Sequence, residues 1–292
     1  MTNQIEISYD EFNNTTKTNK VNQLNKSMLL RSENLTKSFT VHKQITLFKS
    51  EKKEVVALKS FDLTIDKPVI YGLVGPNGAG KTTFIKHCLG LIEKTSGEIQ
   101  VLGYYPYLRK PAFLKQVGLV SGQKQNLDPN LSAVESLRLN GYLYEMVAKE
   151  IDIRIDDLAN RFQVHDKLDV PVRQLSLGQR MKFEIIGSVL HQPKFLFMDE
   201  PTLGLDFEAQ NTMREMLFEL NREQGLTILL TSHYLPDITE LCSKLAVIEK
   251  GQKVFEGTIP DLMAKSSVDG YLGALIEELN KVRASSHFIR QG

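Results

Sequence analysis

A glycine-rich stretch that ends in a lysine and two threonines is the first feature of the sequence that could do chemistry. It fits the pattern G-x-x-x-x-G-K-[ST] and consists of Gly75, Pro76, Asn77, Gly78, Ala79, Gly80, Lys81, Thr82 and Thr83. Glycines let backbone N–H groups turn towards phosphate oxygens, and a following helix adds its positive N-terminal end. In such a loop, Lys81 brings charge to the β- and γ-phosphates of a nucleotide and Thr82 offers a hydroxyl to Mg²⁺. The alternative is a glycine turn without a ligand.

A second candidate is an apolar run that ends in two acidic residues. Residues 195–198 are Phe-Leu-Phe-Met, and Asp199 and Glu200 follow directly. We expect a buried strand beside the phosphate loop, with Asp199 holding the metal through water. Glu200 could then orient or deprotonate an attacking water. The alternative is a pair of solvated surface acids.

A third short motif precedes that strand by about twenty residues. It comprises Ser176, Leu177, Gly178 and Gln179, and the serine is of a type that caps helices. A serine and a glycine at a helix N-terminus can receive phosphate oxygens. Taken alone, the motif indicates only the start of a helix.

The surrounding patterns indicate the elements that must position these residues. Residues 60–66 alternate between apolar and polar types, which predicts a half-exposed antiparallel strand, and residues 69–74 predict a buried strand. Residues 105–173 look mostly helical, and Ser132 with Glu135 has capping-box spacing. Strand and helix patterns alternate afterwards, which favours an α/β fold with a largely parallel sheet.

The three motifs, in this order and at these separations, resemble those of the nucleotide-binding domain of ABC transporters, over about residues 31–263. The resemblance implies a P-loop NTPase fold with a RecA-like α/β core, an N-terminal antiparallel β subdomain and an inserted α-helical subdomain. We expect the ATPase domain over residues 28–265, with the helical subdomain at about 105–190. Residues 1–27 are expected to form a mobile polar tail, with a short interaction arm as the alternative, and residues 266–292 a C-terminal extension.

The resemblance also assigns residues that carry no signal of their own. Gln123 corresponds to the glutamine that binds Mg²⁺ between the two subdomains, with Gln125 as an alternative. His233, just after the predicted strand 227–231, corresponds to the histidine that contacts the γ-phosphate. The loop of residues 203–206, which ends in Asp206, corresponds to the dimer-contact loop.

The aromatic residue that stacks on adenine is expected to be Phe39. Residues 41–53 look like an insertion before the next strand, so Phe48 is an alternative, and neither ring is a third possibility.

What the resemblance implies about mechanism is a pair of domains arranged head to tail. Each ATP, with Mg²⁺, is held by the Lys81 loop of one subunit and by Ser176 to Gly178 of the other. The second ATPase subunit is another copy of this chain or a paralogue. Hydrolysis of ATP drives a separate multi-span membrane permease, so the expected location is peripheral, at the cytoplasmic face of the cell membrane. Leu177 stands where many members of the family carry glycine. In this respect the motif is similar to that of the type-2 exporters of drugs, viologens or polysaccharides.

Composition sets limits on the remaining classes. The 36 basic and 35 acidic residues give a net charge of +1, so no nucleic-acid partner is expected. No apolar run reaches the roughly 18 residues that a membrane-spanning helix needs. Cys88 and Cys242 lie among apolar residues and are expected to be buried thiols. Two alternatives stay open, namely a soluble ABC ATPase that acts on ribosomes or DNA and a regulatory module that has lost hydrolysis.

Overall fold

Two β-sheets organise the part of the chain that the computed structural model describes, which is residues 28–46, 49–122, 125–232, 234–265 and 270–289. The larger sheet has the strand order β5-β6-β7-β3-β8-β9. All neighbouring strands in it are parallel except β8 and β9, which form an antiparallel pair. Its strands are β3 (Ile70–Val74), β5 (Val117–Ser121), β6 (Phe195–Asp199), β7 (Thr227–Ser232), β8 (Lys244–Glu249) and β9 (Gln252–Gly257).

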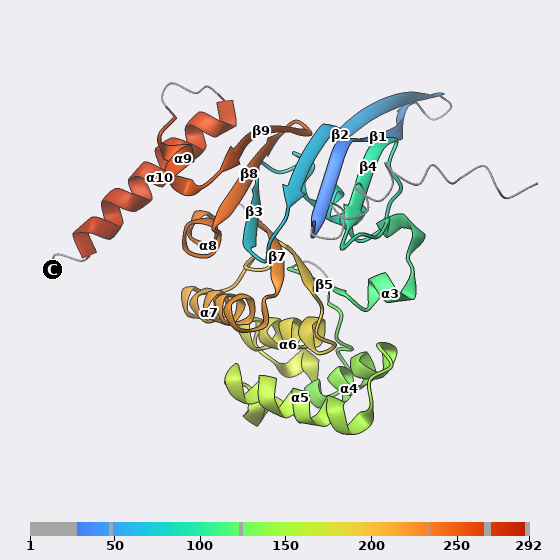
Figure 1. Cartoon of the computed structure of the whole chain (residues 1–292), viewed down its shortest axis with the longest axis vertical. Coiled ribbons are helices and arrows are strands. Elements are labelled where there is room, and N and C mark those ends of the chain that lie inside the picture. The colour runs from blue at the N-terminus through green and yellow to red at the C-terminus, as the bar shows by residue number, and fades with distance from the viewer. Residues whose placement is uncertain (1–27, 47–48, 123–124, 233, 266–269, 290–292) are drawn as a thin grey trace, which may run out of the picture.

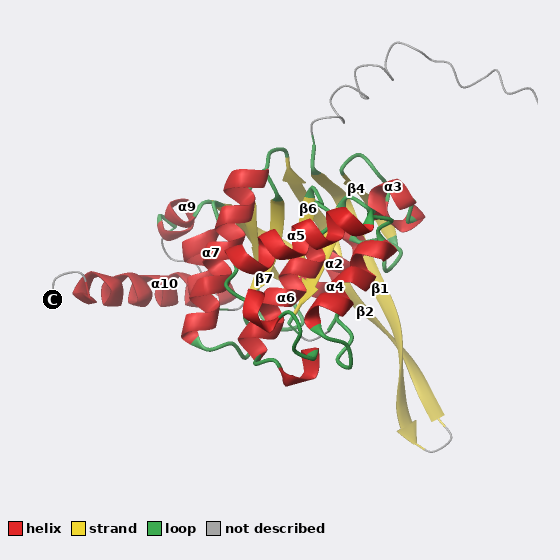
Figure 2. Ribbon diagram, turned by 90° about the horizontal axis from the view of Figure 1, so that it is seen from below, coloured by secondary structure: helices red, strands yellow, loops and turns green. Residues whose placement is uncertain are grey.

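The smaller sheet is antiparallel, with the order β2-β1-β4. It consists of β1 (Leu30–Thr46), β2 (Lys49–Ile65) and β4 (Ser96–Val101). The predicted strand at residues 60–66 lies at the inner end of β2. Of residues 41–53, which looked like an insertion, 41–46 belong to the outer part of β1 and 49–53 to the outer part of β2. Figure 2 shows this hairpin projecting from the body as a two-stranded ribbon.

The helices occupy the connections between strands and the C-terminal end. They are α2 (Lys81–Cys88), α3 (Pro111–Leu114), α4 (Ala133–Leu143), α5 (Ala148–Arg161), α6 (Leu177–Val189), α7 (Phe207–Gln224), α8 (Leu235–Leu241), α9 (Ile259–Met263) and α10 (Gly270–Ile289). Single 3₁₀ turns span Pro106–Leu108, His165–Lys167 and Val172–Gln174. Figure 1 shows α4, α5 and α6 gathered at one end of the molecule and the small sheet at the other. No helix among the described residues has the length and apolar character needed to cross a bilayer.

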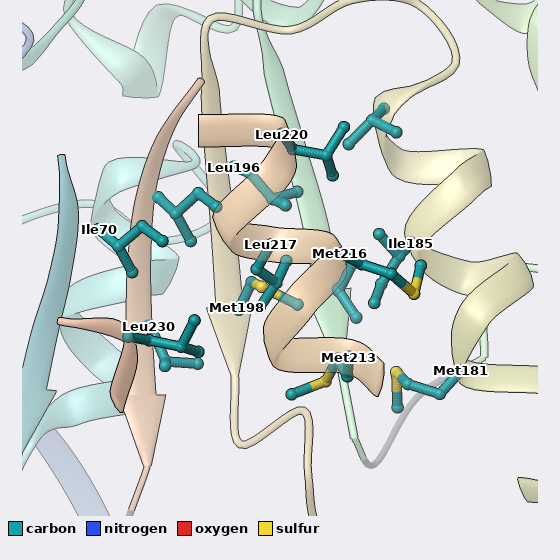
Figure 3. Packing of buried hydrophobic residues seen from close by; sticks show 14 of the residues in the cluster. Ile70, Met181, Ile185, Leu196, Met198, Met213, Met216, Leu217, Leu220 and Leu230 are labelled. Atoms are coloured by element: carbon teal, nitrogen blue, oxygen red, sulfur yellow. The ribbon is translucent and has the colours of Figure 1, made fainter. Parts of the chain in front are cut away.

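The core forms on both faces of the large sheet, because successive side chains of a strand point to opposite faces. Leu196 and Met198 of β6 belong to the cluster under α6 and α7, whereas Phe195 and Phe197 belong to the cluster on the other face. In Figure 3 the stripe predicted on α7, from Met213 to Leu220, packs against Leu196, Met198 and the residues of α6. Each fully buried side chain of this size contributes about 1.5–3 kcal/mol, so this packing fixes where both elements lie.

The segment expected to be mostly helical also contains a strand. Val117–Ser121 form β5 at the edge of the large sheet, paired with β6. A run of only five residues is too short for periodicity to separate a strand from a helix. The inserted helices α4 and α5 therefore begin after β5, and not at residue 105.

Candidate active site

The glycine-rich loop leaves the end of β3 and enters α2, as the sequence predicts. Gly80 has φ 115°, a conformation that side chains rarely adopt. A Cβ at Gly80 would lie 2.5 Å from the carbonyl oxygen of Ala57, and one at Gly75 would lie 2.2 Å from that of Ile248. The loop can therefore pass so close to β2 and β8 only with glycine at both positions.

Lys81, the first residue of α2, is buried with 5% of its surface exposed. Its ammonium donates to the carbonyl oxygens of Gly75 and Pro76, at 2.7 and 3.2 Å, and lies 3.6 Å from Oε1 of Glu200. Burial lowers the pKa of Lys81, and the nearby carboxylates of Glu200 and Asp199 oppose that shift. The loop thus holds a cation whose nearest protein anion is the predicted catalytic acid.

The two acids at the end of β6 are held by the neighbouring strand β7. Oδ1 of Asp199 accepts hydrogen bonds from the hydroxyls of Thr82, at 3.1 Å, and Thr231, at 2.7 Å. The backbone N–H of Glu200 donates to the carbonyl and hydroxyl oxygens of Thr231, both at 3.1 Å. Glu200 has φ 50°, an uncommon conformation for a residue with a side chain. These contacts set the direction of the Asp199 carboxylate and hold the backbone at Glu200 against β7.

The glycine-rich loop, the end of β6 with the segment that follows it and one residue of β2 enclose a cavity of about 460 Å³. It is lined by Ala57, Asn77, Gly78, Gly80, Lys81, Thr82, Thr83, Asp199, Glu200 and Leu203. The volume lies within the range of small-molecule and cofactor sites. Backbone N–H groups of a helix N-terminus and a buried ammonium suit the phosphate groups of a nucleotide.

Two side chains of the same cavity offer oxygen atoms of the kind that Mg²⁺ binds. The Thr82 hydroxyl and the Asp199 carboxylate converge, and Mg²⁺ binds oxygen ligands, usually one or two protein groups together with waters and substrate phosphates. The described residues contain no cluster of three or more His, Cys, Asp and Glu side chains that could hold a metal alone. A Mg²⁺ ion at Asp199 would therefore need further ligands of other kinds, such as the Thr82 hydroxyl, an amide oxygen, phosphate oxygens and water.

Comparison with known proteins decides the family. The ABC transporter family profile matches residues 58–203. The ABC transporter ATP-binding protein NatA of Bacillus subtilis is 37% identical over 216 residues, which cover 74% of this chain and 87% of that protein. The chain belongs to the ABC transporter ATP-binding proteins. The resemblance that the motifs indicated is confirmed, and with it an ATP-binding and ATP-hydrolysing subunit.

Two further relatives agree with this family. A Nod factor export ATP-binding protein of Cupriavidus metallidurans is 35% identical and covers 77% of this chain and 72% of its own length. A solved structure described as the ATP binding subunit of an ABC transporter superposes with a TM-score of 0.65 at 26% identity, covering 80% of this chain and 91% of that one. The predicted P-loop fold, with its antiparallel β subdomain and inserted helices, is confirmed.

The signature motif of this ABC ATPase lies outside the cavity of its own chain. Ser176 caps α6, where its hydroxyl accepts from the N–H of Gln179 and its own N–H donates to the Gln179 side chain. A Cβ added at Gly204 would lie 3.3 Å from Leu177, so the motif adjoins the loop of residues 203–206. None of Ser176, Leu177, Gly178 and Gln179 is among the residues that line the cavity.

Asp206 is the N-cap residue of α7. Its carboxylate accepts from the N–H of Ala209 at 2.8 Å and caps α7. It does not line the cavity. A contact between Asp206 and nucleotide stays a prediction, and it requires a second subunit.

Phe39 lies on β1 opposite Val55 of β2, and 38% of its surface is exposed. The ammonium of Lys37 lies over the Phe39 ring, 5.0 Å from its centroid. The ring does not line the cavity, although Ala57, two residues beyond Val55, does. Stacking of Phe39 on adenine therefore stays a prediction.

Three predicted residues, Phe48, Gln123 and His233, lie outside the residues that the structure describes. The alternative glutamine, Gln125, is exposed and is not part of the cavity lining.

The residue that sequence reasoning missed is Thr231, which holds both acids in place. In the parallel register of β6 and β7, Thr231 pairs with Asp199. Each of these two residues is a polar side chain that follows an apolar run. Polar residues at the ends of adjacent parallel strands meet at one edge of the sheet, and that signal could have indicated Thr231.

Proposed function

We propose that the chain hydrolyses ATP with Mg²⁺ in the cavity between the glycine-rich loop and β6, and that it does so to power a membrane exporter. The observation that carries the proposal is the convergence of Lys81 and Thr82 from α2 with Asp199 and Glu200 from β6 around one cavity. Lys81 would hold the β- and γ-phosphates. Thr82 and Asp199, with Gln123, would hold Mg²⁺, which supplies positive charge to the phosphate oxygens.

The reaction needs a base beside the γ-phosphate, and Glu200, which lines the cavity, is the residue that we assign to it. A water oxygen attacks the γ-phosphorus, the bond from phosphorus to the β-γ bridging oxygen breaks, and ADP leaves with that oxygen. Glu200 accepts a proton from the attacking water. Oε1 of Glu200 lies 3.6 Å from the ammonium of Lys81, so the proposed base is next to the cation that would hold the γ-phosphate.

A second ATPase subunit would complete the site. Ser176 to Gly178 stand at the N-terminus of a 13-residue helix but do not line the cavity of their own chain. A helix N-terminus attracts anions, so these residues suit the phosphates of an ATP bound to a partner. The partner is a second copy or a paralogue, arranged head to tail.

A membrane permease would dock in a separate groove of about 380 Å³. The docking groove, as we call it, lies between the residues after α2, the segment from α3 to β5, and the end of α4, and Leu91, Leu119, Leu143 and Tyr144 are part of its lining. Leu91 and Leu143 are 51% and 74% exposed, which suits an apolar surface of a partner. Gly118 and Leu119 of the lining also place the groove close in sequence to Gln123.

Export is favoured by the relatives and by one residue. The Nod factor relative is named for export. Leu177, in place of a glycine, also suits the exporter branch. These observations favour a transporter over the soluble ATPase of ribosomes or DNA, and we place the subunit peripherally at the cytoplasmic face of the membrane through its permease.

The experiment that tests this proposal is co-purification of the tagged chain from membranes in mild detergent, with partners identified by mass spectrometry. We expect a stoichiometric multi-span membrane protein. Leu143→Asp should lose that partner, while Ile153→Asp, a substitution at a 60% exposed residue of α5 outside the groove lining, should keep it. Recovery with ribosomal or DNA-associated proteins instead would contradict the transporter proposal.

A further inference from the structure

Asp237, in the first turn of α8, is a fully buried carboxylate that the reaction described above does not use. Its Oδ2 accepts hydrogen bonds from the hydroxyls of Thr202, at 2.6 Å, and Ser232, at 3.0 Å. Its Oδ1 accepts from Nη1 of Arg214 at 2.9 Å. Both oxygens of one side chain thus bind three different segments of the chain.

The charge of this carboxylate is balanced inside the protein. Arg214 of α7 is only 4% exposed, and its guanidinium also contacts Glu240, at 2.9 Å, and Asn211. A buried charge is costly unless it is paired and hydrogen-bonded. The hydrogen bonds of Asp237 should therefore hold their partners at fixed positions, because loss of any one leaves a buried polar group without its partner.

Two of the three tethered segments belong to the candidate active site. Thr202 comes two residues after Glu200 and directly before Leu203, which lines the cavity. Ser232 follows Thr231, the residue that holds Asp199 and Glu200. Ser232 Oγ also accepts from the N–H of Tyr234 at 2.9 Å, so it ties the chain on both sides of residue 233.

We propose that Asp237 is a positioning residue for ATP hydrolysis, which holds the segment after Glu200 at a fixed distance from the end of β7. It does not line the cavity, so it acts on the reaction through Thr202 and Ser232. Without this tether, the segments that carry Glu200 and Thr231 can shift apart while the phosphate loop stays intact. Loss of these hydrogen bonds should therefore lower kcat and leave the affinity for ATP nearly unchanged. The proposal rests on the role assigned above to Glu200.

The experiment compares ATP affinity with kcat in Asp237→Asn, Thr202→Val and Ser232→Ala. We expect each variant to bind ATP within about threefold of the wild type and to lose about tenfold in kcat, the effect on a rate of one lost hydrogen bond to a charged group. Thr202→Val and Ser232→Ala act through the same carboxylate, so the double variant should lose less than the product of the two single effects.

Thr227→Val is the matched control. Thr227 is equally buried, lies at the opposite end of β7, and its hydroxyl has no hydrogen-bond partner among the described residues. This variant should keep kcat. Thr202→Val leaves the pair of Asp237 and Arg214 intact, so it remains informative if Asp237→Asn does not fold.

A purely structural role gives a different result. The network variants would then be less stable, but their folded fraction would keep the kcat of Thr227→Val, and that outcome overturns the proposal. If Glu200→Gln retains the wild-type kcat, the proposed function fails first. If Glu200→Gln is inactive while Thr202→Val and Ser232→Ala are fully active, only the inference about Asp237 fails.

Discussion

At the scale of single residues, the candidate active site depends on threonine hydroxyls as much as on charged groups. Thr82 and Thr231 both donate to the same oxygen of Asp199. An acceptor with two fixed donors has one preferred rotamer. The orientation of the carboxylate that is predicted to bind Mg²⁺ therefore depends on side chains from α2 and β7.

Replacing Thr231 by valine tests this dependence. The variant keeps the shape of the side chain and removes the hydroxyl that donates to Asp199, worth roughly 1.5 kcal/mol for a bond to a charged acceptor. We expect the Mg²⁺ concentration for half-maximal ATPase rate to rise about tenfold. A Mg²⁺ titration of the purified variant measures it, and an unchanged titration would show that Thr231 does not orient Asp199.

A pH prediction concerns His191, which precedes β6. Its ring stacks on Tyr144 at 3.6 Å between centroids, and its Nε2 lies 3.1 Å from the carbonyl oxygen of Val117. Burial, with a smaller effect of the charge of Arg154, lowers the pKa of His191 from 6.5 to about 4. The unfolded chain therefore binds more protons than the native one between these two pH values, and stability falls as pH falls from 6.5 to 4.

His191→Phe keeps a stacked ring and removes the titrating group. We expect the urea midpoint of this variant to fall less between pH 6.5 and pH 4 than that of the wild type. Some of the dependence should remain, because burial also lowers the pKa of His87 to about 4. If the two pH profiles are parallel, His191 is protonated equally in both states, contrary to its burial.

At the scale of elements, two helices begin with the same capping motif, but only one of them is predicted to bind nucleotide. Ser132 with Glu135 starts α4, and Ser176 with Gln179 starts α6, each as a complete capping box. Loss of an N-cap serine costs about 1 kcal/mol of stability. Ser132→Ala and Ser176→Ala should therefore lower the free energy of unfolding by similar amounts.

Only the Ser176 variant should lose ATPase activity, because that helix N-terminus is predicted to receive the phosphates of the partner's ATP. Steady-state hydrolysis at saturating ATP distinguishes the two, with Ser132→Ala as the matched control. Equal activity of both variants would show that Ser176 is only a helix cap.

The sequence predicted these elements well where a local rule applied. The caps at Ser132 and Ser176, the apolar stripe of α7 and its end at Gly225, which has φ 63°, all follow from short-range chemistry. The sequence did not predict the strand β5 or the full length of the β1–β2 hairpin. These strands form by pairing with other strands, which a local sequence pattern does not record.

The site divides in the same way. The glycine-rich loop and the two acids are contiguous motifs, and the structure brings Lys81, Thr82, Asp199 and Glu200 to one cavity. The hydrogen bonds from Thr231 to Asp199 and from Thr202 to Asp237 each join residues more than thirty positions apart. A motif cannot reveal such contacts, because they depend on which strands and helices become neighbours.

At the scale of the whole molecule, the described residues place the two predicted halves of a nucleotide site apart from each other. The cavity contains the phosphate loop and the acids, while the signature residues at the start of α6 do not line it. Two chains placed head to tail would bring each half to the other. ATP should therefore act as the link between subunits, and its hydrolysis should separate them.

The most direct test of this claim is the molar mass of Glu200→Gln in solution, measured by light scattering with and without saturating MgATP. The substitution keeps the size of the side chain but removes the base, so hydrolysis should fall by about 100-fold or more while ATP still binds. We expect Glu200→Gln to be a monomer without nucleotide and a stable dimer with ATP. The double variant that also carries Lys81→Ala should stay monomeric with ATP. A Glu200→Gln protein that binds ATP and stays monomeric would contradict the account, unless mixing it with a paralogous subunit restores the dimer.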